Sequence, residues 1–343
     1  QYYNRELQYI REMGAEFERL DNCGGKEFSD AYWFMADYFP LDELDPPAVL
    51  MEMMDSGKED MVERKSDATE MTADTYSRYY LVITRDKNGE VVAVADGNTI
   101  ANDGMCNAFL AHIAVMEKHR RKDIATVLES AVIGVANQHA VEAEEMLGAS
   151  YKTSISGNRV SYMIVETEAA NRIGMKEANL TFTRLMFHAS NGFKVISGFR
   201  YAQVDLEWPA DEPFDAKEWN TVPLLLVVRK IGEESVESLP EADARAIGNQ
   251  LEDYFHMGNL FNSEGVEFDR RHMFKTLEAD AEGNVRMIPL PAEAGDFRGF
   301  LQECPTMDVY LPENYGEHHY TKNYLADFEA ALREGRVMTA EEV

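Results

Sequence analysis

The stretch EKHRRKDIATVLESAV, residues 117 to 132, concentrates positive charge in an otherwise acidic chain. The whole sequence carries a formal net charge of −29, yet Lys118, Arg120, Arg121 and Lys122 lie within five positions. An apolar run with helical spacing starts at Ile124. Free backbone N–H groups and the positive end of a helix dipole attract anions. This stretch therefore predicts a binding site for a diphosphate at the start of a helix.

The nucleotide-binding pattern GxxxxGK[ST] does not accompany this basic stretch. The kinase and ATPase classes thereby lose their main support. A second interpretation is that the basic residues form a solvated turn, with Asp123 as the N-cap of the following helix.

The elements that would position the basic stretch are a strand before it and a helix after it. CNAFLAHIAV, residues 106 to 115, has strand character, and the helix is expected over residues 124 to 140. A hairpin over 79 to 95 is predicted because Asn88-Gly89 supplies a tight turn between two β-rich runs. Further along, we predict a strand at 161–168, a helix at 179–190 and two strands in FRYAQVDLEW and VPLLLVVRKI.

This order of elements resembles the GNAT superfamily of N-acetyltransferases. HIAVMEKHRRKDIATVLE, residues 112 to 129, is similar to its Arg-x-x-Gly-x-Gly/Ala motif through Arg120 and Ala125, with Asp123 in place of the first glycine. LMFHASNGFKVI, residues 185 to 196, is similar to its second motif, a helix that closes in Gly-Phe. The resemblance covers residues 26 to 232. It implies an α/β fold with a mixed, mostly antiparallel, twisted sheet flanked by helices.

The resemblance also implies a cofactor site. Acetyl-CoA would be the acyl donor, and no metal is expected. The implied binding residues are the main chain of the strand end, which would also supply an oxyanion donor, and the loop with the helix start: Ile113, Val115, Arg120, Arg121, Lys122, Asp123, Ile124, Ala125 and Thr126.

Three side chains are candidates for the proton transfers of such a reaction. His188 stands where the family often has a tyrosine that protonates the departing thiolate. Glu166 and His112 are alternative bases for the incoming ammonium, and Glu168 is expected on the same strand face as Glu166. His188 could instead be a partly buried helix residue with a satisfied hydrogen bond. The two glutamates could instead be anchors for the substrate ammonium or part of a solvated rim.

Outside the central region we expect two additions. Residues 1 to 25 have apolar positions at three- and four-residue steps, which favours an amphipathic helix. Residues 26 to 62 should form short helices separated by prolines. Residues 233 to 343 hold 24 acidic and 9 basic side chains, a net charge of −15, and are expected to form a separate acidic α/β extension with a helix at 240–255.

Composition restricts the partners. Acidic side chains outnumber Lys and Arg by 62 to 33, which disfavours nucleic acid and anionic membranes. Three widely spaced cysteines favour a reducing, cytoplasmic location. GEHHY at 316–320 has no HExxH motif beside it, so a metal is not expected there.

The predicted function is acetyl transfer to a primary amine, on a small molecule or a lysine, by direct attack; a homodimer is one option for its assembly. The alternative is a non-catalytic acyl-CoA-binding or interaction module on a degenerate GNAT fold, motivated by Asp123 and by the missing tyrosine.

Overall fold

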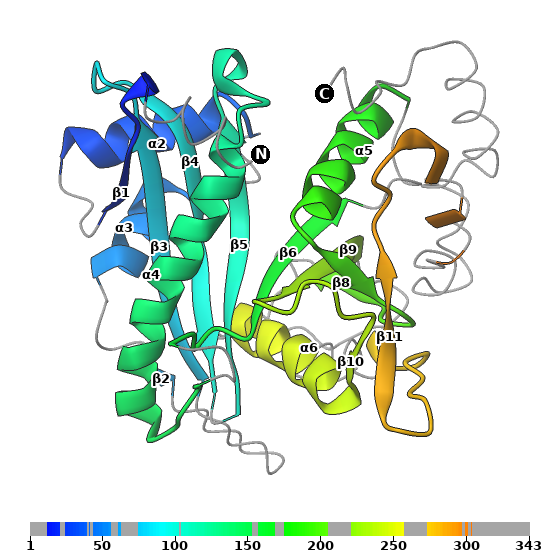
Figure 1. Ribbon diagram of the computed structural model, residues 1–343. Helices are drawn as coiled ribbons and strands as arrows, with labels where there is room; N and C mark the ends of the chain where they lie inside the picture. Colours follow the sequence, from blue (N-terminus) through cyan, green and yellow to red (C-terminus); the bar gives the residue numbers. More distant parts are fainter. Residues whose placement is uncertain are drawn as a thin grey trace. The chain divides into compact units, whose positions relative to one another are not determined.

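The helices and strands of the computed structural model are shown in Figure 1. The described residues are 12–20, 25–39, 41, 44–55, 61–62, 75–102, 104–152, 157–168, 175–204, 221–256, 273–296, 299–300 and 303. The chain divides into two units, residues 1–163 and 164–343. We describe each unit in turn.

The predicted hairpin is confirmed at the centre of the first unit. Strands β3 (Thr75–Arg85) and β4 (Val91–Ala101) pair antiparallel over most of their length. In the turn, the Gly89 N–H donates to the Asp86 carbonyl (2.8 Å) and the Asn88 N–H donates to Asp86 Oδ1 (2.9 Å). Gly89 has a φ of 79°, a backbone conformation that glycine adopts without steric cost. The strands extend beyond the expected limits of 79 and 95.

The sheet of the first unit has the strand order β1–β3–β4–β5, with the short strand β2 (Met61–Val62) also on β3. β5 (Cys106–Val115) and helix α4 (Ile124–Leu147) confirm the strand and helix expected around the basic stretch. A 3₁₀ turn, η1 (Glu117–His119), lies between them. Helix α4 ends at Leu147, seven residues beyond its expected end, and is followed by Gly148 in the left-handed conformation.

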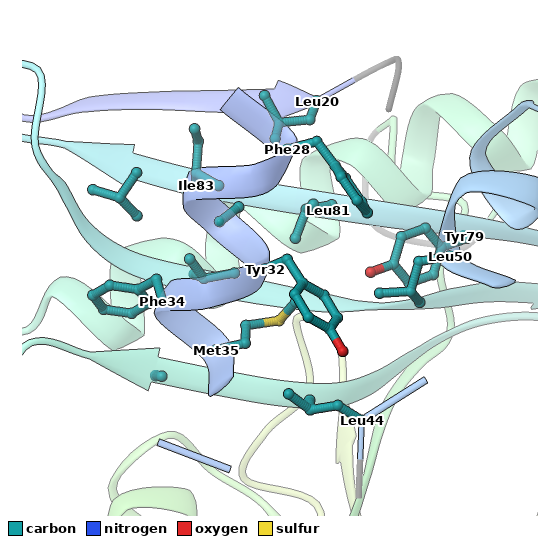
Figure 2. Packing of buried hydrophobic residues seen from close by; sticks show 14 residues of the cluster. Leu20, Phe28, Tyr32, Phe34, Met35, Leu44, Leu50, Tyr79, Leu81 and Ile83 are labelled. Atoms are coloured by element: carbon teal, nitrogen blue, oxygen red, sulfur yellow. The ribbon is translucent and has the colours of Figure 1, made fainter. Parts of the chain in front are cut away.

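Helices cover both faces of this sheet. Side chains alternate along β3, so neighbouring residues of this strand contact helices on opposite faces. Tyr79, Leu81 and Ile83 pack in one cluster with α2 (Lys26–Ala36) and α3 (Pro47–Asp55), as Figure 2 shows. Tyr76 and Arg78 point to the other face, where both contact Glu142 of α4. The short helices predicted between the prolines are therefore confirmed as the layer opposite α4.

The helix predicted over residues 1 to 25 is wrong at 16–20. Of the described residues between 1 and 25, only 12 and 13 are helical, and Glu16–Leu20 forms strand β1. β1 pairs antiparallel with the edge of β3, from Glu16 opposite Arg85 to Leu20 opposite Leu81. Ladder hydrogen bonds to a formed edge outweigh a local helical pattern in so short a segment. Residues 1–11 lie outside the described part.

The second unit contains its own run of paired strands. β6 (Tyr162–Glu168) begins with two residues of the first unit, and the order then continues as β6–β9–β7–β11–β10, with β8 on β9. The bounds are β7 Lys194–Ile196, β8 Tyr201–Val204, β9 Thr221–Lys230, β10 Ser238–Pro240 and β11 Asn284–Pro289. Every pairing whose register is described is antiparallel. The expected α/β class and mostly antiparallel sheet are confirmed.

Helices α5 (Met175–Ser190) and α6 (Glu241–His256) confirm the helices expected at 179–190 and 240–255. A last short turn, η2, covers Ala294–Asp296. β11 follows residue 232 yet pairs with β7, so part of the acidic extension belongs to this sheet. The domain boundaries at 25/26 and 232/233 remain predictions. No helix in the described ranges combines the length and apolar character needed to span a bilayer.

Candidate functional site

The loop between β5 and α4 has an unusual backbone. Arg121 (φ 61°) and Asp123 (φ 52°) are the residues other than glycine that have a positive φ in the described part of the chain. Positive φ is the conformation that the glycine of the Arg-x-x-Gly-x-Gly/Ala motif supplies without steric cost. Alternation of left- and right-handed residues curves the backbone so that successive N–H groups converge, which creates an anion-binding concavity. The loop thus keeps a glycine-like shape without a glycine.

Asp123 is the N-cap residue of α4, but its side chain makes no capping hydrogen bond. The expectation that its carboxylate caps the helix is therefore wrong. Capping residues usually have an extended backbone, whereas that of Asp123 is left-handed. The Val127 N–H is the first to bond back, to the Asp123 carbonyl (3.0 Å). The N–H groups of Ile124, Ala125 and Thr126 precede that bond and have no acceptor within the helix. Their donors face the loop, as the anion-site prediction requires.

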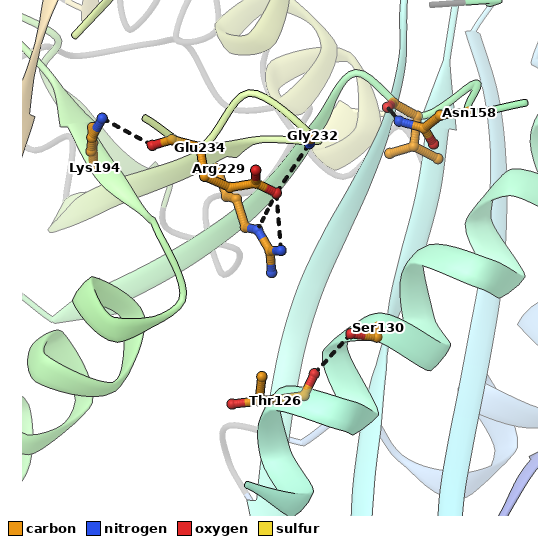
Figure 3. A network of polar contacts seen from close by, with 8 residues as sticks. Thr126, Ser130, Asn158, Lys194, Arg229, Gly232 and Glu234 are labelled. Atoms are coloured by element: carbon orange, nitrogen blue, oxygen red, sulfur yellow. Dashed lines mark hydrogen bonds and ion pairs between the residues drawn. The ribbon is translucent and has the colours of Figure 1, made fainter. Parts of the chain in front are cut away.

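The first turns of α4 also contain a side-chain bond. Ser130 Oγ donates to the Thr126 carbonyl at 3.1 Å (Figure 3). This bond satisfies the serine hydroxyl within its own helix. The Thr126 carbonyl accepts this bond, while its N–H is one of the three first-turn donors. Its side chain is half-buried.

Three cations of the basic stretch, Lys118, Lys122 and Arg120, contact different groups. Lys118 Nζ pairs with Glu90 (3.0 Å), and Lys122 Nζ donates to the Lys118 carbonyl (3.1 Å). Arg120 Nε donates to the Val115 carbonyl (3.0 Å), and its guanidinium lies 5.6 Å from the centre of the Tyr38 ring. Arg120 therefore braces the loop against β5 and the turn that follows α2. This bracing has no sequence signal, because the contact depends on the fold of the loop.

All four cations reach solvent: Lys118, Arg120 and Arg121 are exposed and Lys122 is half-exposed. His119 is buried, and its pKa is lowered by desolvation and by the charges of Lys118 and Lys122. A neutral His119 adds no charge to the basic stretch at pH 7.

The end of β5 presents two peptide groups away from β4. The Met116 N–H donates to the Val92 carbonyl (2.8 Å), so the peptide groups of Met116 and Ala114 face β4. Successive residues in a strand point their N–H and C=O groups to opposite edges. Ile113 and Val115 therefore direct theirs to the other edge, where Arg120 meets the Val115 carbonyl. This orientation suits the main-chain role predicted for both residues.

A β-bulge interrupts the pairing of β4 with β5 just before that strand end. Asp96 lies opposite His112 and Gly97 opposite Leu110, so Ala111 is an extra residue in β5. A Cβ on Gly97 would lie 2.0 Å from the Phe109 carbonyl oxygen, which only glycine tolerates. We did not predict this bulge; the signal for it was a lone glycine inside the strand VVAVADGNTIA.

The bulge brings His112 against a buried carboxylate. His112 Nδ1 lies 2.9 Å from Asp96 Oδ1, and the His112 backbone N–H donates to the same oxygen (3.1 Å). The Tyr79 hydroxyl donates to Asp96 Oδ2 (2.9 Å). Sequence reasoning proposed His112 but missed Asp96 and Tyr79, although an aspartate inside an apolar strand was a visible signal.

Two further groups surround His112. The Phe39 ring contacts the imidazole edge to face, with centroids 4.8 Å apart. The pKa of the exposed Asp45 carboxyl is raised by desolvation and by the Asp96 charge, while His112 lowers it. Because Tyr38 touches Arg120 and Phe39 touches His112, the turn that follows α2 contacts both the basic loop and the histidine.

Glu166 and His188 belong to the second unit, whereas His112 and the loop belong to the first. Glu166 accepts a hydrogen bond from the Tyr201 hydroxyl of β8. The side chain of Glu168 lies outside the described part, so its predicted face remains untested. In the same unit, Glu234 accepts from Arg229 (3.1 Å) and from the Gly232 N–H (3.0 Å), which closes the turn after β9 (Figure 3).

His188 is buried in the last turn of α5, between the rings of Phe187 and Phe193. Desolvation, with a smaller effect of Arg184, lowers its pKa to about 4. The imidazole is therefore neutral at pH 7 and holds no proton beyond its ring N–H. The structural interpretation holds for its place in the helix, but the side chain is buried rather than partly buried and its Nδ1 has no hydrogen-bond partner among the described residues. Asn191 Nδ2 donates to the Phe187 carbonyl (3.0 Å), a hydrogen bond at the C-terminal end of this helix.

No metal cluster is formed by the described side chains: nowhere among them do three or more His, Cys, Asp or Glu residues gather in a way that could hold an ion. GEHHY at 316–320 lies outside the described ranges. The structure therefore leaves the metal expectation for that segment untested.

The chain matches no protein-family model and no curated protein sequence. It is similar to solved structures described as acetyltransferases. A Bacteroides thetaiotaomicron protein assigned to the GNAT family aligns with a TM-score of 0.35 and 14% identity, over 69% of this chain and 95% of its own. A GNAT-family acetyltransferase from Staphylococcus aureus MU50 aligns at 0.32 and 11%, over 63% and 99%.

An aminoglycoside 6'-N-acetyltransferase in complex with coenzyme A aligns with a TM-score of 0.33 and 12% identity, over 63% of this chain and 97% of its own. Scores this low leave the activity of this chain to be argued from its own residues.

Proposed function

We propose that this protein is an acetyl-CoA-dependent N-acetyltransferase that transfers an acetyl group to a primary amine by direct attack. The observation that carries the proposal is the loop between β5 and α4, where left-handed Arg121 and Asp123 precede the first turn of a 24-residue helix. Such a backbone binds a diphosphate through its N–H groups. Arg121 and Lys122 add charge-assisted contacts to phosphate oxygens.

The rest of the cofactor would extend along β5. Its pantetheine amides would pair with the outward peptide groups of Ile113 and Val115, and one N–H there would stabilise the oxyanion formed at the thioester carbon. Arg120 holds the loop in place through the Val115 carbonyl and serves binding indirectly. Ile124, Ala125 and Thr126 would contribute their main-chain N–H groups.

We infer that residues 26 to 232 contain the transferase unit and that His112 is the base, ahead of Glu166. His112 is held by a carboxylate and reaches the surface, with one fifth of its side chain exposed. Glu166 remains a second base or an anchor for the acceptor ammonium. His188, neutral at pH 7, would donate a hydrogen bond from its ring N–H to the departing thiolate rather than a proton. The acceptor would be a small amine or a lysine. A homodimer is the assembly that we propose.

The test combines binding with turnover. Acetyl-CoA should bind the chain in calorimetry, and a panel of spermidine, glucosamine and a lysine peptide should include an amine that releases free thiol from it. Mass spectrometry should find that amine heavier by one acetyl group. Binding without thiol release from any amine would favour the alternative of a non-catalytic acyl-CoA-binding module. Absence of binding would contradict the proposal.

A further inference from the structure

A carboxylate is buried at the point where β4 and β5 lose their regular pairing. Asp96 is 3% exposed and lies beside the bulge at Gly97. A buried carboxylate is costly unless donors satisfy its oxygens. Here three donors do so: the Tyr79 hydroxyl, the His112 backbone N–H and His112 Nδ1. Only the last two come from the same residue.

The contact with Asp96 determines which ring nitrogen of His112 carries the proton. An ionised carboxylate only accepts hydrogen bonds, so Nδ1 must be the protonated ring nitrogen in this contact. Nε2 then carries the lone pair of the neutral ring. The His112 side chain is 20% exposed whereas that of Asp96 is 4% exposed. The imidazole therefore connects a buried carboxylate to the surface, in the tautomer that a base requires.

The bulge is what allows one oxygen to hold His112 twice. In a regular antiparallel ladder the His112 N–H would donate to a carbonyl of β4. The extra residue Ala111 changes that pairing, and the N–H donates to Asp96 Oδ1. Gly97 is needed for the close approach of the two strands, and the Tyr80 hydroxyl donates to the Phe109 carbonyl (2.7 Å) at the same point. Backbone and side chain of His112 are thus fixed together.

We propose that Asp96, held by Tyr79, is a positioning residue that makes His112 the base for the incoming amine. The proposal rests on the proposed function. His112 Nε2 takes one proton from the acceptor ammonium, and Asp96 stabilises the resulting imidazolium. The neutral amine forms the C–N bond, the C–S bond breaks, and the proton lost by the attacking nitrogen goes to the thiolate. One amide, one CoA thiol and the proton on His112, later released to water, are the products.

The first test needs no acceptor. Nitrogen-15 NMR of the native chain should show His112 as the Nδ1–H tautomer, with the signal assigned by its loss in His112→Gln. Asp96→Asn should change that signal, and Tyr79→Phe should change it less. Glu18→Gln, an acidic residue exposed on β1, should leave it unchanged. An Nε2–H tautomer in the native chain would overturn the proposal.

The second test uses acetyl-CoA with the fastest amine of the panel. Asp96→Asn should lower kcat at least about 100-fold, the usual scale of general-base catalysis. The KM for acetyl-CoA should stay within about threefold, since the cofactor loop is intact. His112→Gln and the double variant should lose about as much as Asp96→Asn, because residues that act as a unit are not additive.

Calorimetry with acetyl-CoA distinguishes a failure of the positioning role of Asp96 from a failure of the proposed function. If acetyl-CoA binds and turns over natively but Asp96→Asn keeps its kcat while its fold persists by circular dichroism, the positioning role is wrong and the proposed function stands. If Asp96→Asn does not fold, Tyr79→Phe decides: an unchanged tautomer signal and an unchanged kcat would overturn the proposal. Failure of acetyl-CoA to bind the native chain would reject the proposed function and, because it rests on that function, the base role as well.

Discussion

At the scale of single residues, Asp123 is the position where the chain departs from the motif it resembles. Its φ of 52° costs an alanine about 1 kcal/mol or more and costs a glycine nothing. We therefore predict that Asp123→Gly is more stable than Asp123→Ala by about 1 kcal/mol in urea unfolding. Asp123→Gly should also bind CoA as tightly as the native chain or more tightly, because it removes a carboxylate beside the diphosphate. Equal stability of the two variants would contradict the left-handed assignment.

His188 should make the protein sensitive to acid. Its pKa is lowered to about 4 in the folded state, first by desolvation and second by Arg184, whereas an unfolded histidine titrates near 6.5. The folded state binds fewer protons, so this stabilisation is fully present above pH 6.5 and is lost as the pH falls toward 4. The loss between pH 7 and pH 5 should be about 2 kcal/mol.

The matched variant is His188→Phe, which keeps an aromatic ring between Phe187 and Phe193. Its unfolding free energy, measured in urea, should fall by about 2 kcal/mol less than that of the native chain between pH 7 and pH 5. His139, whose pKa is lowered to about 3, remains in both proteins and cancels in the comparison. Parallel losses in the two proteins would show that His188 is not buried in its neutral form.

At the scale of elements, the bulge between β4 and β5 depends on Gly97. A Cβ there would meet the Phe109 carbonyl at 2.0 Å and the Tyr80 hydroxyl at 2.8 Å. Gly97→Ala should therefore lower the unfolding free energy by more than about 2 kcal/mol. Gly134→Ala is the control, because an added Cβ on this exposed face of α4 meets nothing within 4 Å. It should raise stability by about 0.5–1 kcal/mol. A mild effect of Gly97→Ala would show that the bulge is not fixed there.

The elements differ in how far sequence reasoning could place them. β3, β4, β5 and α4 were predictable because turn chemistry at Asn88-Gly89 and apolar periodicity agree with the tertiary structure. β1 was not, because its pairing with the edge of β3 overrides its helical spacing. In the site, the loop and His112 could be found from residue types, but the partners of His112 and Arg120 could not. Those contacts join residues distant along the chain, such as Tyr38 with Arg120 and Tyr79 with Asp96.

At the scale of the whole molecule, a net charge of −29 repels an anionic cofactor at long range. The proposed CoA site must overcome that repulsion locally, where charge-assisted hydrogen bonds outweigh a field screened over about 8–10 Å. CoA binding should therefore depend on the cations next to the start of α4, Arg121 and Lys122. Lys118, already paired with Glu90, should contribute little.

The most direct measurement is calorimetric titration of CoA into the native chain and two variants. Arg121→Asn/Lys122→Gln removes the two cations nearest in sequence to the start of α4, with asparagine chosen because it tolerates a positive φ. Its Kd should rise at least about tenfold, since two contacts of about 1.5 kcal/mol or more are lost. Lys118→Gln should change the Kd less than about threefold. No binding to the native chain, or equal binding by the double variant, would contradict the assignment of this loop to CoA.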